Sequence, residues 1–151
     1  MSTNDITVGS AGYSWDGNNM ITLLHQRLAA TVAKPLVTGD TYQLFHIPAG
    51  SICLYGWYVV RTTDAGTGTI TINAVSTAAT VPMVTTQATS GAAGTAILPA
   101  TGWVGKWFEV DGTINVVIGT ANLTTSVVDV FVMIVNSTVR ADAAARIVYA
   151  S

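Results

Sequence analysis

The acidic and histidine side chains are the residues that could catalyse a reaction or hold a metal ion, and they are scattered along the sequence. A glycosidase needs two carboxyl groups about 5 to 10 Å apart across a cleft. Only Glu109 and Asp111 are close in the sequence, and their spacing of two places both on one face of a strand, beside a turn. We therefore expect solvated carboxylates there and no catalytic pair. His25 and His46 have no Cys, His or carboxylate at metal-ligand spacing, so the sequence predicts structural histidines, with no metal and no cofactor.

Other signatures of catalysis are absent from the sequence. There is no Gly-x-Ser-x-Gly elbow, no His-Glu-x-x-His, no Gly-x-Gly-x-x-Gly and no Walker loop. The single cysteine, Cys53, stands between Ile52 and Leu54 in an apolar run, where we expect a buried and unreactive thiol. We therefore predict that the protein is not an enzyme.

The four tryptophans could bind a ligand or a partner protein. Trp103 and Trp107 could stack a sugar ring at the rim of a β-sandwich; alternatively, one packs inward and the other fills a subunit interface, which we favour. Trp57 lies in an apolar run and is predicted to be a core residue. Trp15 and Tyr13 lie in a Gly- and Asn-rich segment and are typical of aromatic anchors at protein interfaces.

The composition excludes several classes of protein. The 151 residues are 50% hydrophobic and 9% charged, with a formal net charge of −2 and one cysteine, which suits one domain with its own core and excludes a disulfide scaffold. So little basic surface argues against binding to nucleic acid or to a membrane surface. The most apolar run, residues 127–135, includes Asp129 and is shorter than the roughly 20 residues of a membrane helix. No basic region followed by an apolar stretch opens the chain, so we expect no secretory signal peptide and synthesis in the cytoplasm.

The pattern from residue 41 onward is typical of an all-β protein, with short runs rich in Val, Ile, Thr and aromatic residues. Residues 69–75 and 113–118 alternate apolar and polar side chains, as half-buried strands do. Residues 54–60 and 127–135 are apolar on both faces, which fits central strands covered on two sides or a subunit contact.

Turn residues divide these runs. Asp111 and Gly112 fit a two-residue type I′ turn between strands at 107–110 and 113–116. Residues 64–68 should close a second hairpin, between 55–63 and 69–75. Residues 48–50, Pro-Ala-Gly, separate a third pair of strands, 42–47 and 52–62. The Thr/Ala/Gly/Ser-rich stretch between residues 76 and 100 predicts a surface excursion with short strands near 81–85 and 96–98.

The two ends of the chain differ from this pattern. Apolar residues recur at every fourth position near the N-terminus: Met20, Leu24, Leu28 and Val32. This spacing fits an amphipathic helix over residues 20–33, but an extended arm fits equally well, because Thr22 and Thr31 are poor helix formers. We assign residues 1–36 to an N-terminal arm, 37–136 to a β-sandwich domain and 137–151 to a C-terminal tail.

The segment at residues 35–50, PLVTGDTYQLFHIPAG, is followed by an aromatic and β-branched strand and then by DAGTGT at residues 64–69. This pattern resembles the small virion proteins of tailed bacteriophages that decorate or cement the head, well over residues 35–71 and more loosely over 127–135. The resemblance implies an antiparallel β-sandwich of the jelly-roll kind with an extended N-terminal arm and no catalytic site. It also implies a virion protein on the outer surface of the head, bound at junctions between subunits of the major capsid protein.

The partners expected from the resemblance are therefore the major capsid protein and further copies of this chain, with a homotrimer as the first expectation. The candidate interface residues are Tyr13, Trp15, Met20, Leu24, Leu28, Trp103, Trp107, Ile147 and Tyr149. The alternative function is an adhesion module of a head fibre or tail, which would bind host surface glycan through Trp103, Trp107 and Asp111.

Overall fold

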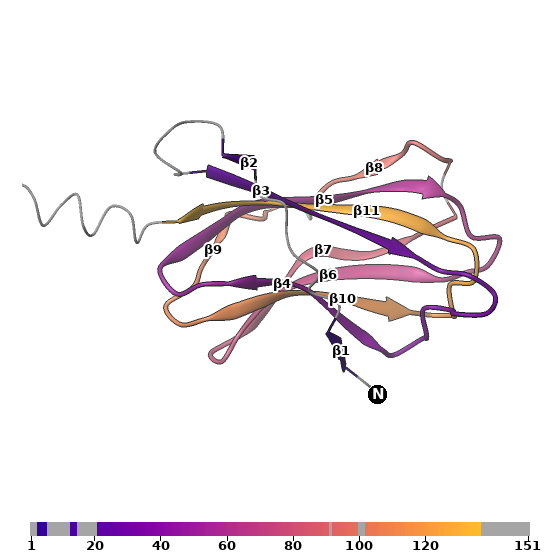
Figure 1. Ribbon diagram of the computed structural model, residues 1–151, viewed down its shortest axis with the longest axis horizontal. Coiled ribbons are helices and arrows are strands. Elements are labelled where there is room, and N and C mark those ends of the chain that lie inside the picture. Colours follow the sequence, from indigo (N-terminus) through magenta and orange to yellow (C-terminus); the bar gives the residue numbers. More distant parts are fainter. Residues whose placement is uncertain (1–2, 6–12, 15–20, 91, 100–101, 137–151) are drawn as a thin grey trace, which may run out of the picture.

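The computed structural model describes residues 3–5, 13–14, 21–90, 92–99 and 102–136. These residues form two β-sheets that stack face to face, and none of them is helical (Figure 1). The architecture is therefore the all-β sandwich that the sequence predicts. Among the described residues, no helix is present that could cross a membrane.

The first sheet, called sheet A below, has the strand order β1-β4-β10-β6-β7. Its strands are β1 (Thr3–Asp5), β4 (Thr41–Ile47), β10 (Gly112–Gly119), β6 (Thr69–Ser76) and β7 (Thr80–Ala88). The second, sheet B, has the order β2-β3-β11-β5-β8, and β9 also pairs with β5. Its strands are β2 (Tyr13–Ser14), β3 (Ile21–Ala29), β11 (Val127–Asn136), β5 (Ser51–Thr62), β8 (Ala96–Ile97) and β9 (Lys106–Trp107). The pair β1–β4 is parallel and the other pairs are antiparallel.

The pairing of the long strands is nested. β6 pairs with β7, β5 with β8 and β9, β4 with β10, and β3 with β11. The chain thus forms one long hairpin with its tip between β6 and β7, where the Ser76 N–H donates to the Ala79 carbonyl at 2.9 Å. Successive pairs fall alternately in sheet A and sheet B, which is the rolled arrangement of a jelly roll.

The three predicted strand pairs are wrong, although each predicted break in the chain is present. At residues 48–50, 64–68 and 108–111 the chain passes from one sheet to the other instead of returning beside itself. Gly112 is also not among the described residues with positive φ, so no type I′ turn forms there. Gly112 is needed for a different reason, because a Cβ atom at this position would overlap the Phe108 ring and the Val75 carbonyl oxygen.

Of the two alternatives that the sequence leaves open for residues 20–33, a helix or an extended segment, the structure shows an extended strand over residues 21–29. Residues 21–29 form β3, which pairs with β11 over nine residues from Ile21↔Val135 to Ala29↔Val127. These residues therefore belong to the sandwich and not to an arm. A spacing of four places residues on one face of a helix, but it is also an even number and places them on one face of a strand.

The predicted strands at 69–75 and 113–118 are confirmed. Their inward side chains lie in the core: Ile70, Ile72, Ala74, Ile114, Val116 and Ile118. The short strand predicted near 81–85 is β7, which is longer, and the one predicted near 96–98 is β8. The core between the sheets also includes the inward residues of β11, which are Val128, Val130, Val132 and Ile134.

The outward faces of the two sheets differ in chemistry. Sheet A presents mainly hydroxyl and amide side chains: Thr41, Gln43, Thr69, Thr71, Asn73, Thr86, Thr113 and Asn115. Two of them, Thr71 and Thr86, join their hydroxyl groups at 3.1 Å. The outward face of sheet B is mainly apolar and aromatic. The structure therefore has one well-hydrated face and one face suited to contact with another surface.

Candidate interaction surface on sheet B

The outward face of sheet B is built from rows of side chains that cross its strands. Strand pairing places them side by side in four rows, which we call the sheet B face: Ile21, Val135, Ile52 and Trp107; Leu23, Met133 and Tyr55; His25, Phe131 and Trp57; and Arg27, Asp129 and Val59. Ile21, Tyr55 and Trp107 are 43%, 38% and 47% exposed. Three apolar rows and one ionic row thus cover a continuous area of sheet.

The third row is an aromatic stack. The His25 and Phe131 rings lie 4.7 Å apart between centroids at 18°, and the Phe131 and Trp57 rings lie 5.2 Å apart at 13°. The Tyr55 and Trp57 rings are tilted relative to each other, with 5.9 Å between their centroids. The sequence predicted a core position for Trp57, and this prediction is wrong. Trp57 is a half-buried member of this outward row. Such a stack holds the aromatic side chains in fixed positions on a flat surface.

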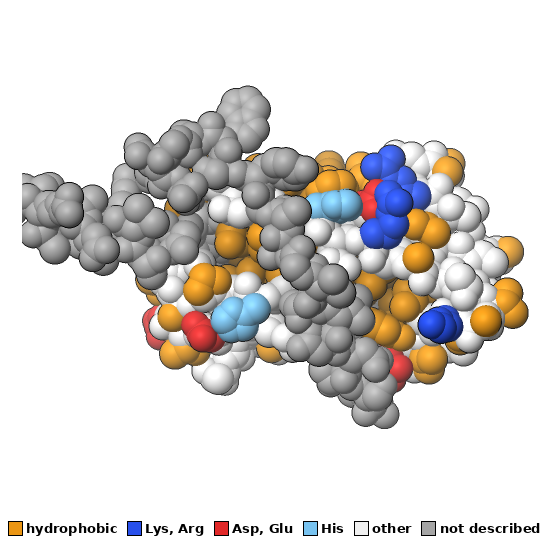
Figure 2. Space-filling view, viewed as in Figure 1, with side chains coloured by type: hydrophobic (Ala, Val, Ile, Leu, Met, Phe, Trp, Pro, Cys, Tyr) orange, Lys and Arg blue, Asp and Glu red, His pale blue; other side chains and the backbone are white. Residues whose placement is uncertain are grey.

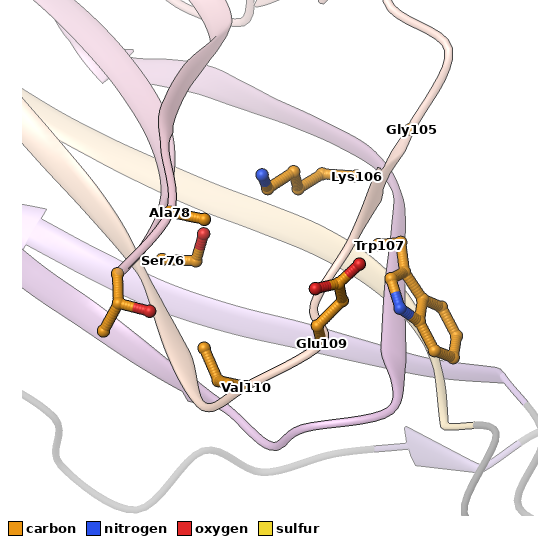
Figure 3. A pocket seen from close by; sticks show the side chains of 8 residues that line it. Ser76, Ala78, Gly105, Lys106, Trp107, Glu109 and Val110 are labelled. Atoms are coloured by element: carbon orange, nitrogen blue, oxygen red, sulfur yellow. The ribbon is translucent and has the colours of Figure 1, made fainter.

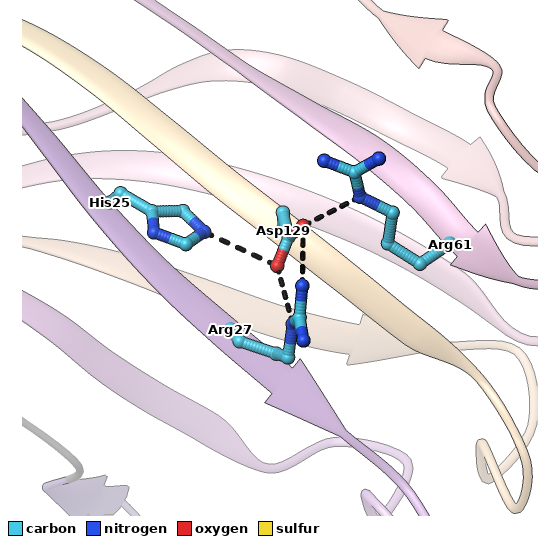
Figure 4. A network of polar contacts seen from close by, with 4 residues as sticks. All are labelled: His25, Arg27, Arg61 and Asp129. Atoms are coloured by element: carbon cyan, nitrogen blue, oxygen red, sulfur yellow. Dashed lines mark hydrogen bonds and ion pairs between the residues drawn. The ribbon is translucent and has the colours of Figure 1, made fainter.

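The ionic row is organised around Asp129, which is buried although it faces outward (Figure 4). Arg27 donates from Nε to Oδ1 at 2.7 Å and from Nη2 to Oδ2 at 3.0 Å, and Arg61 donates from Nε to Oδ2 at 2.6 Å. His25 Nε2 lies 3.2 Å from Oδ1. The hydrogen bonds from Arg27, followed by those from Arg61 and His25, hold the pKa of Asp129 well below its usual range, and Asp129 in turn raises the pKa of Arg27.

The two arginines give this end of the sheet B face a net positive charge. They share a single carboxylate, and their side chains are 58% and 50% exposed. Nη1 of Arg27 and both Nη atoms of Arg61 have no hydrogen-bond partner among the described residues. Figure 2 shows these cationic side chains gathered around an acidic one, with a histidine and hydrophobic side chains beside them. The face therefore combines apolar area with free N–H donors.

The predicted interface residues lie in different parts of the structure, some on the sheet B face and others in or against the core. Trp107 lies on the sheet B face, as the favoured interpretation of the tryptophan pair requires. Trp103 packs against the core, and its indole N–H donates to the Leu54 carbonyl at 2.8 Å. Leu24 and Leu28 are 6% and 2% exposed and point into the core, so their assignment to an interface is wrong.

The remaining predicted interface residues lie at the chain ends. Tyr13 belongs to β2, where its backbone pairs with Leu23. Four predicted positions lie outside the described residues: Trp15, Met20, Ile147 and Tyr149.

A cavity of about 400 Å³ lies between the β6–β7 turn and the segment around β9. Figure 3 shows the Lys106 and Glu109 side chains reaching toward the turn residues Ser76 and Ala78, while the indole of Trp107 extends to the other side of its strand. Trp107 is among the residues that line this cavity, whereas Trp103 is held against the core, so the two tryptophans have different surroundings.

Asp111 and Cys53 have positions that explain them by structure alone. Asp111 accepts a hydrogen bond from the Ala49 N–H at 2.8 Å and lies 3.6 Å from His46 Nε2, so it holds the β4–β5 corner. Cys53 is fully buried, and desolvation raises the pKa of its thiol to about 12. Within the described ranges, no three His, Cys, Asp or Glu residues lie close enough to hold a metal ion.

Sequence reasoning missed the sheet B face as a site. The signal was the alternation in both strands, where 21, 23, 25, 27 and 129, 131, 133, 135 hold apolar, aromatic and charged side chains on the face opposite the core. Residues 127–135 are apolar on both faces in the sequence, but no local pattern identifies the strand at 21–29 that pairs beside them. Arg27, Arg61 and Asp129 come together only through that pairing.

Comparison with known proteins gives matches in structure but not in sequence. No protein-family model matches the chain, and no curated protein matches it. A chain in "Cyanophage Pam1 capsid asymmetric unit" aligns over 85% of this chain and 91% of its own length, with a TM-score of 0.55 and 20% identity. A chain in "Capsid of Ralstonia phage GP4" aligns over 87% of this chain and 90% of its own length, with a TM-score of 0.55 and 14% identity. A chain in the acidic stable capsid of Helicobacter pylori bacteriophage KHP30 aligns over 77% of this chain and 87% of its own length, with a TM-score of 0.55 and 12% identity. This chain therefore has the fold of the chains that it matches in these three phage capsid structures.

Proposed function

We propose that this chain is a structural protein of a phage virion without catalytic activity. It binds the outer surface of the head at junctions between major capsid subunits and stabilises the shell, as a cement or decoration protein. Its partners are the major capsid protein and further copies of itself, with a homotrimer as the assembled form.

The observation that carries this proposal is the similarity to chains from three phage capsid structures along nearly their full length. The alignments cover 87 to 91% of those chains and 77 to 87% of this one. The matched chains are therefore of about this size, and the shared fold extends over most of each of them.

The chemistry of the two outer faces supports the same function. A protein that ties shell subunits together needs one surface that makes contacts and another that remains in water. The apolar rows of the sheet B face suit contacts, and the threonine- and asparagine-rich face of sheet A suits hydration. Many weak contacts of this kind add up when several copies bind one shell.

The test is quantitative mass spectrometry of purified particles of the phage that encodes this chain, counted against the major capsid protein. A cement or decoration protein should be present in hundreds of copies at a fixed ratio to the shell subunit. A handful of copies per particle would indicate a fibre or tail role instead, and absence of the chain would contradict a virion function. Native mass spectrometry of the purified protein tests the trimer separately.

A further inference from the structure

We propose that the sheet B face is the surface that contacts the capsid shell, and that its occupant is an apolar protein surface carrying a carboxylate that pairs with Arg27 and Arg61. This inference rests on the proposed function and deepens it, because it names the face, the partner chemistry and the residues that select it.

The first step is the asymmetry of the sandwich. The sheet B face presents an unbroken area of apolar and aromatic side chains across β3, β11, β5 and β9. Its exposed members include Ile21, Tyr55 and Trp107. Contiguous apolar area of this kind, rimmed by charge, is typical of protein interfaces, and aromatic residues and arginine contribute most to binding there.

The second step is the electrostatics of the ionic row. Asp129 is the one acidic residue of β3, β5, β9 and β11, and its two oxygens already accept three hydrogen bonds from Arg27 and Arg61. Three guanidinium nitrogens therefore remain to be satisfied when water leaves the surface. Burying them without acceptors would be unfavourable.

The third step identifies the occupant. A second copy docked through the same face would add two more arginines and only one carboxylate, which is already engaged. Such a contact would leave the guanidinium donors of both copies without acceptors. A surface that brings its own carboxylate satisfies them by charge-assisted hydrogen bonds, so complementarity favours an acidic, apolar partner over another sheet B face.

The contact can be identified by site-specific photo-cross-linking in assembled particles. The photoreactive phenylalanine analogue p-benzoylphenylalanine replaces Tyr55, an exposed aromatic residue of the sheet B face. In a matched control it replaces Thr86, which is exposed on sheet A. We expect a product with the major capsid protein from position 55 and none from position 86. A product between two copies of this chain from position 55, or a shell product from position 86 alone, would overturn the inference.

Binding of purified full-length variants to heads assembled without this chain gives an independent measure. Tyr55→Glu should weaken binding by on the order of tenfold or more, as expected for a central interface residue, whereas Thr86→Glu should leave it within about twofold. Arg61→Gln should also weaken binding and reduce its dependence on salt, because it removes one cation from the contact. Thermal unfolding confirms that each variant is folded.

The outcomes separate this inference from the proposed function. If the wild-type chain binds no heads and is absent from particles, the proposed function fails and the inference fails with it. If the wild type binds heads and Tyr55→Glu binds equally well, the function stands and the assignment of the face is wrong. If Tyr55→Glu loses binding because it converts an oligomer to monomers in sedimentation, the face joins copies of this chain and the assignment to the shell is also wrong.

Discussion

Asp129 shows how one residue can organise a surface and also make it sensitive to pH. Its carboxylate is covered by Arg27, Arg61 and His25, and their hydrogen bonds lower its pKa. A carboxyl group with a lowered pKa stabilises the folded state fully above the pKa of the unfolded chain, which is about 3.9. That stabilisation is lost as the pH falls below about 5 towards the pKa of the folded state.

Replacing Asp129 with Asn should therefore change both the stability and its dependence on pH. We expect Asp129→Asn to lower the free energy of unfolding at pH 7 by about 1–2 kcal/mol, since the half-exposed arginines regain water. The loss should shrink as the pH is lowered from 5 to 2, because in that range the unfolded wild-type chain takes up a proton at Asp129 that the folded state does not. Urea denaturation at several pH values measures this, with Glu109→Gln as a control that removes an exposed carboxylate. Equal pH dependence in the wild type and Asp129→Asn would contradict the assignment.

Asp64, like Asp129, is a buried carboxylate held by several hydrogen bonds, and it lies at a corner of the sandwich. It is 4% exposed, and its oxygens accept backbone N–H bonds from Gly66 at 2.8 Å, Thr124 at 2.6 Å and Thr125 at 3.0 Å. These bonds, led by the one from Thr125, lower its pKa. Asp64 thereby ties the β5–β6 connection to the β10–β11 connection.

Replacing Asp64 should loosen both connections. We expect Asp64→Ala to cost about 2–3 kcal/mol, because three partly buried backbone N–H groups lose their acceptor. Asp64→Asn should cost less, since its single carbonyl oxygen can still accept on one side. Urea denaturation of the two variants gives the order, and hydrogen exchange of the Thr124 and Thr125 amides shows whether the loss is local. Equal stability of Asp64→Ala and the wild type would rule out this role.

At the scale of single elements, the sequence predicted the alternating strands well and the connections poorly. Strands such as β6 and β10 carry a period of two that only a half-buried strand explains. Turn residues show where the chain reverses, but they do not show whether the next strand lies in the same sheet. In a jelly roll most neighbours in sequence lie in opposite sheets, so the prediction of three adjacent hairpins could not succeed from local signals.

The strand β3 was missed for a different reason. Its inward leucines are four apart, a spacing that fits both a helix and a strand. The deciding observation is the pairing with β11 over nine residues, which no local pattern contains. The ionic row was missed as a consequence, because Arg27 lies on a strand that the sequence did not assign.

Gly112 provides a test of the revised connection between β9 and β10. The predicted turn required positive φ at this residue, whereas the structure requires the absence of a Cβ atom beside the Phe108 ring and the Val75 carbonyl. Gly112→Ala should therefore destabilise the protein by about 1–3 kcal/mol through overpacking. Thermal unfolding measures the effect. Gly94→Ala is a useful comparison, because Gly94 has a φ of 89° and open space around it, so its cost comes from backbone strain.

Adding Phe108→Leu to Gly112→Ala should recover part of the stability that Gly112→Ala loses. A ring that no longer occupies the space cannot clash with the new methyl group. The control is Phe108→Leu alone. If Phe108→Leu lowers the free energy of unfolding as much in Gly112→Ala as it does in the wild type, the Phe108 contact is not the cause of the loss.

At the scale of the whole molecule, the resemblance in sequence and the similarity in structure agree on a jelly roll. Its two outer faces differ in chemistry. The strand pattern from residue 41 onward predicted the all-β class, and the resemblance carried by the segment at 35–50, which includes β4, implied the jelly roll. The sequence could not predict how the two outer faces differ, because both are assembled from strands distant in the chain. The polar face of sheet A requires β4, β10, β6 and β7 side by side, and the apolar face of sheet B requires β3, β11 and β5 side by side.

The N-terminal residues provide a test of how much of the binding lies outside the sandwich. The nine strands that nest into the jelly roll begin with β3 at Ile21, and among the described residues β1 and β2 precede it. Deleting residues 1–19 should therefore leave a cooperatively folded sandwich. If an arm contributes to binding on the shell, as the sequence analysis predicts, the deletion should abolish co-sedimentation with heads, because an arm and a face that bind together gain affinity by linkage.

The comparison with Tyr55→Glu decides how the two contributions relate. A truncated protein that folds and binds as well as the full chain would eliminate the arm and leave the sheet B face as the sole contact. A truncated protein that loses binding while Tyr55→Glu retains it would assign the contact to the arm. Loss in both variants is the expected result, because two linked contacts supply the affinity together and removing either one weakens binding. Thermal unfolding of the truncated protein is the control, since loss of β1 also uncovers the edge of β4.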